Sequence, residues 1–372
     1  MKQNYHAPDY TFIYTSIGII LFGLIMLSSA GVALAYKEYN DSYYFLKHQI
    51  VFGLIPGIFL FYLMARIDYK NWKKISFPLL IFSIALLILV FIPGLGIKGG
   101  SAKSWIKILG VSFQPAEFVK LTFLIYLARW LEKKETIVKD FTYGLLPFLI
   151  LLGSIMFLII MQPDMGTMLI IILMSFTVFF VAGADIGHLF FVGLAGILLM
   201  FFLMQLKPYR MERFTTFLHP EADPQGIGYH INQSLLAIGS GGILGRGFGQ
   251  SRQKFLYLPE PVGDSIFAII AEEMGFIICI VVIFAFLYLM MRGLNIAKNA
   301  PDNFGKFLVI GIIAWFIIQA LLNIGGMMSL LPMTGVPLPL ISYGGSSLLT
   351  CMAGLGIIVN ISMQTTDKSL KS

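Results

Sequence analysis

Ten long apolar stretches limit what this chain can fold into. A helix needs roughly 20 mostly apolar residues to cross the hydrocarbon core of a bilayer. The candidate spans are residues 11–35, 48–65, 76–96, 116–131, 144–162, 166–184, 188–206, 265–291, 306–330 and 346–364. Only 12% of the 372 residues are charged, which is about half the share in soluble domains. The chain is therefore expected to be an integral membrane protein.

The apolar stretches are expected to be helices. Backbone groups in lipid must be satisfied inside the protein, and the alternating strand pattern of outer-membrane barrels is absent from the sequence. The first stretch is too long for a signal peptide. The fourth is short and charged, so it is expected to be either tilted or shielded by neighbouring helices. The sequence thus predicts an all-α polytopic bundle of about ten transmembrane helices, forming a single membrane domain over residues 1–372.

The positions of Lys and Arg in short connections predict the orientation, because these residues concentrate on the cytoplasmic side. Three connections that would share one side contain Arg66, Lys70, Lys73, Lys74, Lys133, Lys134, Lys139, Arg292, Lys298 and Lys306. They all face the cytoplasm if both termini are cytoplasmic. The long loop over about 207–263 is then extracytoplasmic.

That long loop is itself basic. Arg210 and Arg213 stand at i and i+3 beside the end of a span, and Arg246 and Lys254 follow further along. Guanidinium forks on one helical face suit a phosphate or pyrophosphate. Nucleic acid is a poor alternative because the patch faces outward. A merely solvated basic face remains the other reading.

The same loop contains two further patterns. The segment GSGGILGRGFG (239–249) lacks the strand and the glycine spacing of a dinucleotide fingerprint, so it is expected either to bend tightly near a substrate or to be flexible. In the segment 228–238, Ile231, Leu235 and Ile238 share a helical face, which predicts a short helix on the membrane surface.

Acidic residues are concentrated in LPEPVGDSIFAIIAEEMGF (258–276), which holds Glu260, Asp264, Glu272 and Glu273. From spacing alone, Asp264 fits a helix N-cap. Glu272 and Glu273 follow two turns later on different faces, so they cannot share one compact site with it. A charge inside a span normally meets a partner or a wet cavity.

The other spans offer Lys120 as the obvious partner for Glu272 or Glu273, with Glu117 one turn before it. An interhelical contact is therefore predicted, and a substrate or ion path is the alternative. Glu117 also suits the first turn of a helix after Pro115. Asp164, in QPDMGT (162–167), fits a turn and N-cap. Cys279 and Cys351 lie in apolar spans and, like the scattered histidines, form no metal-ligand spacing.

Several long motifs in order resemble the SEDS family of bacterial cell-wall proteins, whose members include FtsW, RodA and SpoVE. They are WIKILGVSFQPAEFVKL (105–121), QPDMGT (162–167), the run 217–276 and NIGGMMSLLPMTGVPLPLISYGGSSL (323–348). GFGQSRQKFLYLPE is more similar to FtsW than to RodA. PEPVGD (259–264) departs from the His-Thr pair that many members have before the Asp, but keeps the Asp.

The resemblance implies a ten-helix peptidoglycan glycosyltransferase of the bacterial cytoplasmic membrane. Such enzymes polymerise lipid II at the outer face and work with a class B penicillin-binding protein and, in division, with other divisome membrane proteins. The family's catalytic aspartate maps onto Asp264. Candidate substrate residues are Arg210, Arg213, Arg246, Lys254, Trp105, Asp164, Ser342 and Ser346; Ser342 and Ser346 could instead only permit a tight turn.

The residues are sufficient for glycosyl transfer. A base must take the proton of the acceptor hydroxyl, whereas a pyrophosphate leaving group needs only fixed cations to stabilise its charge. Asp264 would serve as the base, and the external Arg and Lys residues as the cations, with Mg or Mn as a possible divalent cofactor.

Two other classes compete with this reading. A lipid II flippase would explain the spans and buried charges, although no pair of matching interrupted segments indicates inverted repeats. A division scaffold has no use for a basic cluster beside a lone acid.

Overall fold

The computed structural model describes residues 5–99, 102–108, 111–134, 137–205, 211, 215–217, 219 and 226–365. Two short π-helical turns, η1 (Ile50–Leu54) and η3 (Phe141–Leu145), lead into α4 and α7. The other elements, in chain order, are α1 (Tyr10–Ala30), α2 (Val32–Tyr39), α3 (Tyr44–Gln49), α4 (Ile55–Arg66), α5 (Tyr69–Leu89), β1 (Gly96–Gly99), β2 (Ala102–Ile108), β3 (Val111–Phe113), α6 (Pro115–Lys134), α7 (Leu146–Met161), α8 (Met165–Val181), α9 (Ile186–Gln205), α11 (Ile227–Gly241), α12 (Ile266–Lys298), α13 (Asn303–Met327) and α14 (Gly345–Ser362).

Each of the predicted spans corresponds to one helix or to one continuous run of helices, such as α3, η1 and α4 for residues 48–65. In the described part of the chain, seven of these helices are long and apolar enough by themselves to cross a membrane. The helix α8 is shorter, with 17 residues, and α6 carries charge. The prediction that neighbours shield α6 is confirmed, because Glu117 and Lys120 are both buried.

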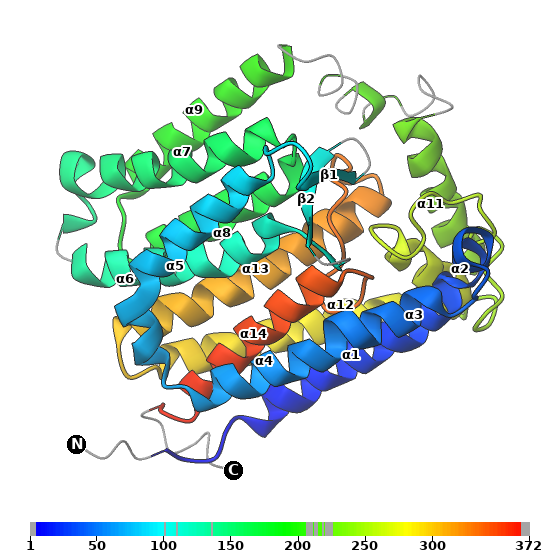
Figure 1. Cartoon of the computed structure of the whole chain (residues 1–372), viewed down its shortest axis with the longest axis horizontal. Helices are drawn as coiled ribbons and strands as arrows, with labels where there is room; N and C mark the ends of the chain where they lie inside the picture. The colour runs from blue at the N-terminus through cyan, green and yellow to red at the C-terminus, as the bar shows by residue number, and fades with distance from the viewer. Residues whose placement is uncertain are drawn as a thin grey trace.

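The helices lie side by side as one bundle, with α13 and α14 inside it (Figure 1). These two helices are the most buried of the candidate spans, at 72% and 89% of the apolar window. The helix α14 packs against α4, and α13 packs against α12, α8 and α6. The centre of the bundle is therefore the place where α6, α13 and α14 meet.

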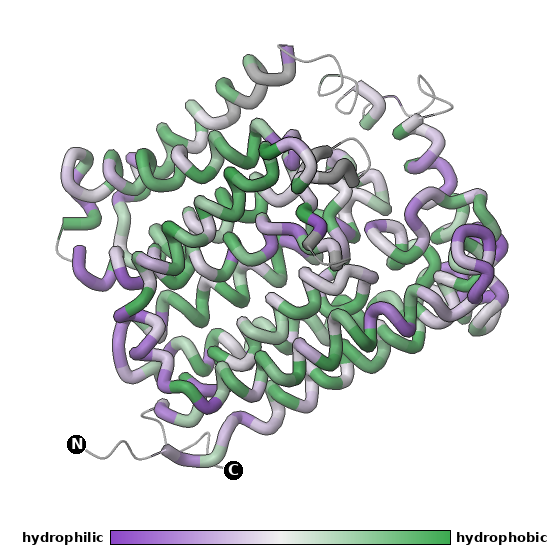
Figure 2. Tube along the Cα trace, in the orientation of Figure 1, coloured by the Kyte–Doolittle hydropathy of each residue, from purple (hydrophilic) through white to green (hydrophobic). Residues whose placement is uncertain are grey.

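The two ends of the bundle differ in charge. The basic residues of the orientation prediction lie in the helix ends that flank the connections α4–α5, α6–α7 and α12–α13, or in those connections, at the end where both chain termini lie (Figure 1). At that end the backbone N–H of His6 donates to the carbonyl of Met363 across 3.0 Å. Figure 2 shows hydrophilic segments at the helix ends and apolar colour along the helices. We call this basic end the inner end and the opposite one the outer end.

A small sheet at the outer end was not predicted from the sequence. Its three strands pair antiparallel in the order β1-β2-β3, between the end of α5 and the start of α6. Ile97 pairs with Trp105, and Ile106 pairs with Phe113. The fold remains a polytopic helical bundle, and the sheet places Trp105 at the outer end.

The helix α12 is broken at Gly275, whose φ of 77° and ψ of −178° are not helical. The carbonyls of Glu272 and Glu273 accept from Arg246 N and Gly247 N, at 3.0 and 2.9 Å. Beyond the break, Phe276 N and Ile277 N donate to the carbonyls of Gly242 and Ile243. The glycine-rich segment 239–249 therefore supplies backbone partners to an interrupted helix, a role that the sequence did not suggest.

The helix predicted within 228–238 is present as α11, but its packing differs from the prediction. Its buried face consists of Gly228, Ile231, Ser234, Ala237 and Gly241, whereas Leu235 is exposed. This face packs against α12, and a Cβ on Gly241 would lie 1.9 Å from the carbonyl oxygen of Ala271. Small residues allow this close approach of two helices, so α11 is held by α12 and not by a membrane surface alone.

Candidate functional site

A cavity of about 670 Å³ lies at the outer end of the bundle. It is lined by the ends of elements that are far apart in the sequence: α3, β2, the starts of α6, α8 and α14, the segment 260–264 and the segment 334–337. The predicted residues that line it are Trp105, Glu117, Asp164, Asp264 and Ser346. The fold thus gathers five predicted residues from five separate segments into one cavity.

Asp264 stands at the junction between the long outer loop and α12. Its backbone carbonyl accepts from Asn323 Nδ2 across 2.7 Å. A Cβ on Gly335 would lie 3.8 Å from Asp264 Oδ2, and Gly335 has a φ of 69°, in the left-handed region that favours glycine. The N-cap of α12 is Ser265, and its side chain makes no capping bond. The N-cap explanation of Asp264 is therefore wrong.

Asp164 caps α8, as predicted, and also faces the cavity. Its Oδ1 accepts from Thr167 N across 3.0 Å, and its Oδ2 accepts from Gln114 Nε2 across 2.9 Å. Burial raises the pKa of the Asp164 carboxyl above its usual range. Desolvation penalises the charged form of this carboxyl, and both of its oxygens are engaged as acceptors.

Below the cavity, Glu117 pairs with Lys120 on the same helix. Lys120 Nζ lies 2.7 Å from Glu117 Oε1, and the two side chains are almost fully buried. The ammonium also donates to Gln319 Oε1 across 2.9 Å and lies 4.8 Å from the centre of the Trp315 ring. This cation is therefore held on three sides by α6 and α13.

The structure separates the two predicted serines. Ser346 lines the cavity, and its Oγ accepts from Gln114 N across 3.2 Å. Ser342 does not line it: its Oγ accepts from Leu338 N across 2.8 Å, within the turn before α14. Ser342 therefore stabilises the turn before α14, and Ser346 remains a candidate substrate-binding residue.

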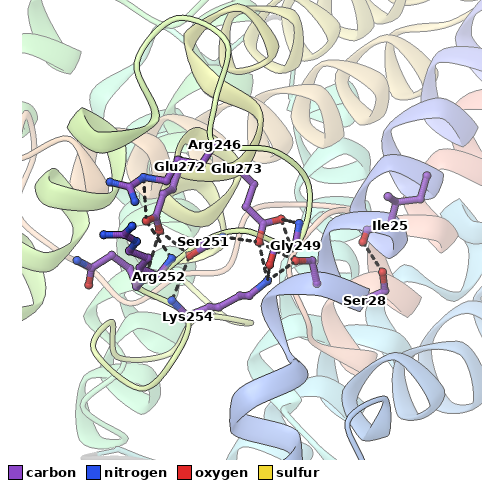
Figure 3. Close-up of polar contacts among 11 residues, drawn as sticks. Ile25, Ser28, Arg246, Gly249, Ser251, Arg252, Lys254, Glu272 and Glu273 are labelled. Atoms are coloured by element: carbon purple, nitrogen blue, oxygen red, sulfur yellow. Dashed lines mark hydrogen bonds and ion pairs between the residues drawn. The ribbon is translucent and has the colours of Figure 1, made fainter.

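The predicted contact of Lys120 with Glu272 or Glu273 is wrong. Glu273 accepts from Lys254 Nζ and Ser29 Oγ, at 2.8 and 2.7 Å, and from the backbone N–H groups of Gly249 and Ser251. Glu272 accepts from Ser251 Oγ and from the N–H groups of Arg252 and Gln253. Figure 3 shows that both carboxylates form polar contacts with residues of the loop 246–254. The prediction considered only partners on other spans, whereas the cation that pairs with Glu273 is Lys254 of the outer loop.

The same contacts correct one predicted phosphate ligand, Lys254, and leave a second, Arg246, untested. Lys254 is 2% exposed and donates to Glu273, Ser29 and the carbonyl of Gly249, so it cannot reach a substrate. Arg246 lies 3.7 Å from Glu272 and donates from Nε to the carbonyl of Ser240, but its side chain is 32% exposed, so its role as a phosphate ligand stays a prediction. Neither residue lines the cavity. Arg210 and Arg213 lie outside the described residues.

Several residues that line the cavity, or that donate hydrogen bonds to residues lining it, were not predicted from the sequence. Glu260 lines it with a φ of 47°, and its pKa is raised by burial and by the nearby charge of Glu38. Gln114 joins Asp164 to Ser346. Gln319 and Asn323 were visible as two amides one turn apart in an otherwise apolar span, and this spacing was the signal that could have found them.

The described residues contain no group of three or more His, Cys, Asp or Glu side chains placed to hold a metal ion. The structure therefore shows no protein site for the predicted divalent cation in this part of the chain.

Fold and site together define a class: a polytopic helical membrane protein with an acidic cavity at its outer end. A family model described as "Cell cycle protein", which covers FtsW, RodA and SpoVE, matches residues 9–367. The chain belongs to this family, the SEDS proteins, and is a multi-pass protein of the bacterial cytoplasmic membrane.

Relatives match over nearly the whole chain. Stage V sporulation protein E of Bacillus subtilis is 41% identical, with 97% of this chain and 99% of the relative covered. The probable peptidoglycan glycosyltransferase FtsW of Trichlorobacter lovleyi is 39% identical, with 97% and 95% covered. The similarity to FtsW is therefore shared with a sporulation protein.

Solved structures agree on the fold. A chain from the structure described as "Structural coordination of polymerization and crosslinking by a peptidoglycan synthase complex" superposes with a TM-score of 0.80 at 28% identity, covering 96% of this chain and 98% of that one. The rod shape determining protein RodA of Thermus thermophilus gives 0.71 at 27% identity, with 97% and 99% covered.

Proposed function

We propose that this protein is a peptidoglycan glycosyltransferase that polymerises lipid II at the outer face of the cytoplasmic membrane. The observation that carries the proposal is the position of Asp264 in a cavity of about 670 Å³ at the outer end of the bundle. Membership of the family and the names of relatives such as FtsW support the same activity. A substrate with a lipid tail can remain in the bilayer while its sugar enters such a cavity.

Asp264 acts as the general base in this proposal. It takes the proton from the acceptor sugar hydroxyl as that oxygen attacks the anomeric carbon of the donor sugar. The bond between the anomeric carbon and the pyrophosphate oxygen breaks, and the polyprenyl pyrophosphate leaves with the electron pair. One carboxylate is sufficient because the leaving group needs no proton, in contrast to glycoside hydrolysis with its two carboxyl groups.

Fixed positive charge stabilises the leaving pyrophosphate. With Lys254 buried against Glu273 at the break in α12, Arg210 and Arg213 are the proposed ligands, and the partly exposed Arg246 is a further candidate. Their spacing of three residues suits a bidentate grip on phosphate oxygens. Trp105, Asp164 and Ser346 line the cavity and are proposed to contact the sugar or peptide portion of the substrate.

The biological setting follows from two similarities. We place the enzyme in septal wall synthesis during cell division, because it resembles FtsW in the GFGQSRQKFLYLPE segment and over its whole length. The 41% identity to a stage V sporulation protein favours a sporulation role as the second candidate. Depletion in growing cells separates the two: filaments without septa support division, and normal growth with failed spore maturation supports sporulation.

A class B penicillin-binding protein is the proposed partner, together with other divisome membrane proteins. The solved peptidoglycan synthase complex contains a chain of the same fold and concerns polymerisation together with crosslinking. A crosslinking enzyme at the outer face would receive the glycan strand directly from the cavity.

The activity is tested by reconstituting the purified protein in liposomes with lipid II, with and without a class B penicillin-binding protein. Glycan strands resolved by gel electrophoresis are the expected product. A labelled lipid II that crosses the bilayer without being polymerised would support the flippase instead, and neither activity in the presence of the partner would support a scaffold.

A further inference from the structure

Asn323 is a buried amide on α13 that contacts Asp264, and it takes no part in the proposed proton transfer or glycosyl transfer. Its side chain is 2% exposed. Its Nδ2 donates to the carbonyl of Asp264 across 2.7 Å and to the carbonyl of Val336 across 2.8 Å. An amide nitrogen carries two hydrogens, so it can make both bonds at once. One side chain therefore joins the backbone of Asp264 to the segment 334–337.

The segment that Asn323 holds is the wall beside the Asp264 carboxylate. Oδ2 of Asp264 lies 3.8 Å from the place where a Cβ on Gly335 would be. This wall is fixed in turn by α8, because a Cβ on Gly166 would lie 2.4 Å from Val336 Cγ1 and 2.8 Å from the carbonyl oxygen of Thr334. The segment cannot move away from Asp264 toward α8 without a clash.

The same face of α13 also supports the other side of the cavity. Gln319, one turn before Asn323, donates from Nε2 to the carbonyl of Pro337 across 2.8 Å. Its Oε1 accepts from Lys120, the partner of Glu117. Two amides at i and i+4 lie one above the other on a helix. The helix α13 thus sets the spacing between the Glu117 side and the Asp264 side.

A buried amide costs free energy unless it is hydrogen-bonded, and polar residues of this kind often hold membrane helices together. Helix association alone would be satisfied by bonds to any neighbouring helix. Asn323 instead donates to two non-helical backbone positions at the cavity, one of which is the carbonyl of Asp264. Because both acceptors belong to residues that line the cavity, Asn323 is expected to have a role at the site.

We propose that Asn323 is a positioning residue that fixes Asp264 against the wall formed by Gly335 and Val336. The proposal rests on the proposed function, in which Asp264 is the base. A displacement of the base by about 1 Å can reduce turnover by on the order of 100-fold. Loss of Asn323 is therefore expected to lower kcat while leaving lipid II binding almost unchanged.

The chain offers a matched control in Asn360 on α14. It is also fully buried, its Nδ2 donates to the carbonyl of Ala65 across 2.8 Å, and its Oδ1 accepts from Tyr69 N across 2.9 Å. It lies near the inner end, away from the cavity. Asn323→Leu and Asn360→Leu each remove a buried amide of similar size. If Asn323→Leu does not fold, Asn323→Ser and Asn360→Ser replace the pair.

Three quantities are measured on both variants: kcat and KM for lipid II polymerisation, the Tm in detergent, and deuterium exchange of peptides covering 258–268. The proposal expects similar Tm losses in both, with faster exchange and a kcat at least tenfold lower only for the Asn323 variant, at a KM within twofold of wild type. Equal kcat in the two variants, or a loss explained entirely by KM, would overturn it. Unchanged exchange over 258–268 would also overturn it.

Failure of the proposed function gives a different pattern. If the base is not Asp264, Asp264→Asn remains active, and faster exchange in the Asn323 variant appears without a fall in kcat. That result would overturn the positioning role and identify the wrong assignment of the base as the reason.

Discussion

Lys254 and Glu273 form a buried ion pair in which the ammonium lies 2.8 Å from the carboxylate and both side chains are at most 2% exposed. Lys254 comes from the outer loop, and Glu273 lies two residues before the break in α12. Ser29 of α1 bonds to both of them. The pair therefore ties the loop, α1 and the interrupted helix into one unit (Figure 3).

Removing one partner of this pair should destabilise the protein strongly. Lys254→Met leaves the Glu273 charge buried without its cation, for which a loss of about 3–5 kcal/mol is expected. The double change Lys254→Met with Glu273→Gln should cost less than the two single losses added together. Thermal unfolding in detergent measures these differences. Lys47→Met is the control, because the Lys47 side chain in the Lys47–Asp41 pair is 65% exposed and the loss of an exposed pair should change the stability little.

Gly275 should not tolerate a side chain. Its φ of 77° is unfavourable for other residues, and a Cβ would lie 2.2 Å from the backbone nitrogen of Gly245. Gly275→Ala therefore forces the loop away from the helix break and should lower stability by at least about 1–3 kcal/mol. Gly153→Ala in α7 is the control, because nothing lies within 4 Å of its Cβ position. Equal melting temperatures of the two variants would show that the loop does not require the close approach.

His230 should make the protein sensitive to acid. Its Nε2 lies within hydrogen-bond distance of Ser265 Oγ, and burial lowers its pKa from 6.5 to about 4. The unfolded chain therefore takes up a proton between these values while the folded protein does not. Stability is full above the unfolded pKa of 6.5 and is lost as the pH falls toward 4, by at most about 3 kcal/mol.

His230→Gln should flatten this pH dependence, measured as Tm against pH from 8 down to about 4. His219→Gln is the control, because His219 is exposed and its removal should leave the acid dependence unchanged. A steep acid loss that persists in His230→Gln would assign the effect to other groups.

Arg210 and Arg213 should hold the donor pyrophosphate. Replacing either by Ala should lower polymerisation at limiting lipid II by about 10- to 100-fold, which corresponds to one or two charge-assisted hydrogen bonds. Lys should rescue only in part because it lacks the fork of the guanidinium. Initial rates at lipid II concentrations below KM are the measurement. Wild-type rates for both Ala variants would mean that these residues form only a solvated face.

Much of the membrane architecture could be predicted because its causes are local. Apolar length and the capping preference of Asp164 each follow from a short stretch of sequence, and the structure agrees with both. The Lys and Arg residues used to predict the orientation lie at one end of the bundle, and the orientation itself stays a prediction. Asp264 was identified through resemblance, and its spacing alone suggested an N-cap that Ser265 in fact occupies.

The contacts of the charged residues could not be predicted, because they depend on which distant segments meet. Lys254 looked like a free cation in a loop, yet it is buried against Glu273. The choice of Lys120 as a partner assumed that a charge in a span must pair with another span. The glycines of 239–249 carried a real signal of close approach, but nothing in the segment revealed that the approached surface is a helix break.

Asp264→Asn in the reconstituted polymerisation assay tests the whole mechanism. The amide keeps the shape of the carboxylate but cannot accept the acceptor's proton, so the rate should fall by roughly 10²- to 10⁴-fold, the contribution of a general base. Expression, insertion and partner binding should be unchanged, and Asp264→Glu should retain little activity because its longer arm misplaces the base. Asp302→Asn is the control, because Asp302 caps α13 at the inner end and Asn caps as well as Asp. A well-folded Asp264→Asn enzyme that polymerises lipid II at the wild-type rate would contradict the account and remove Asp264 as the base.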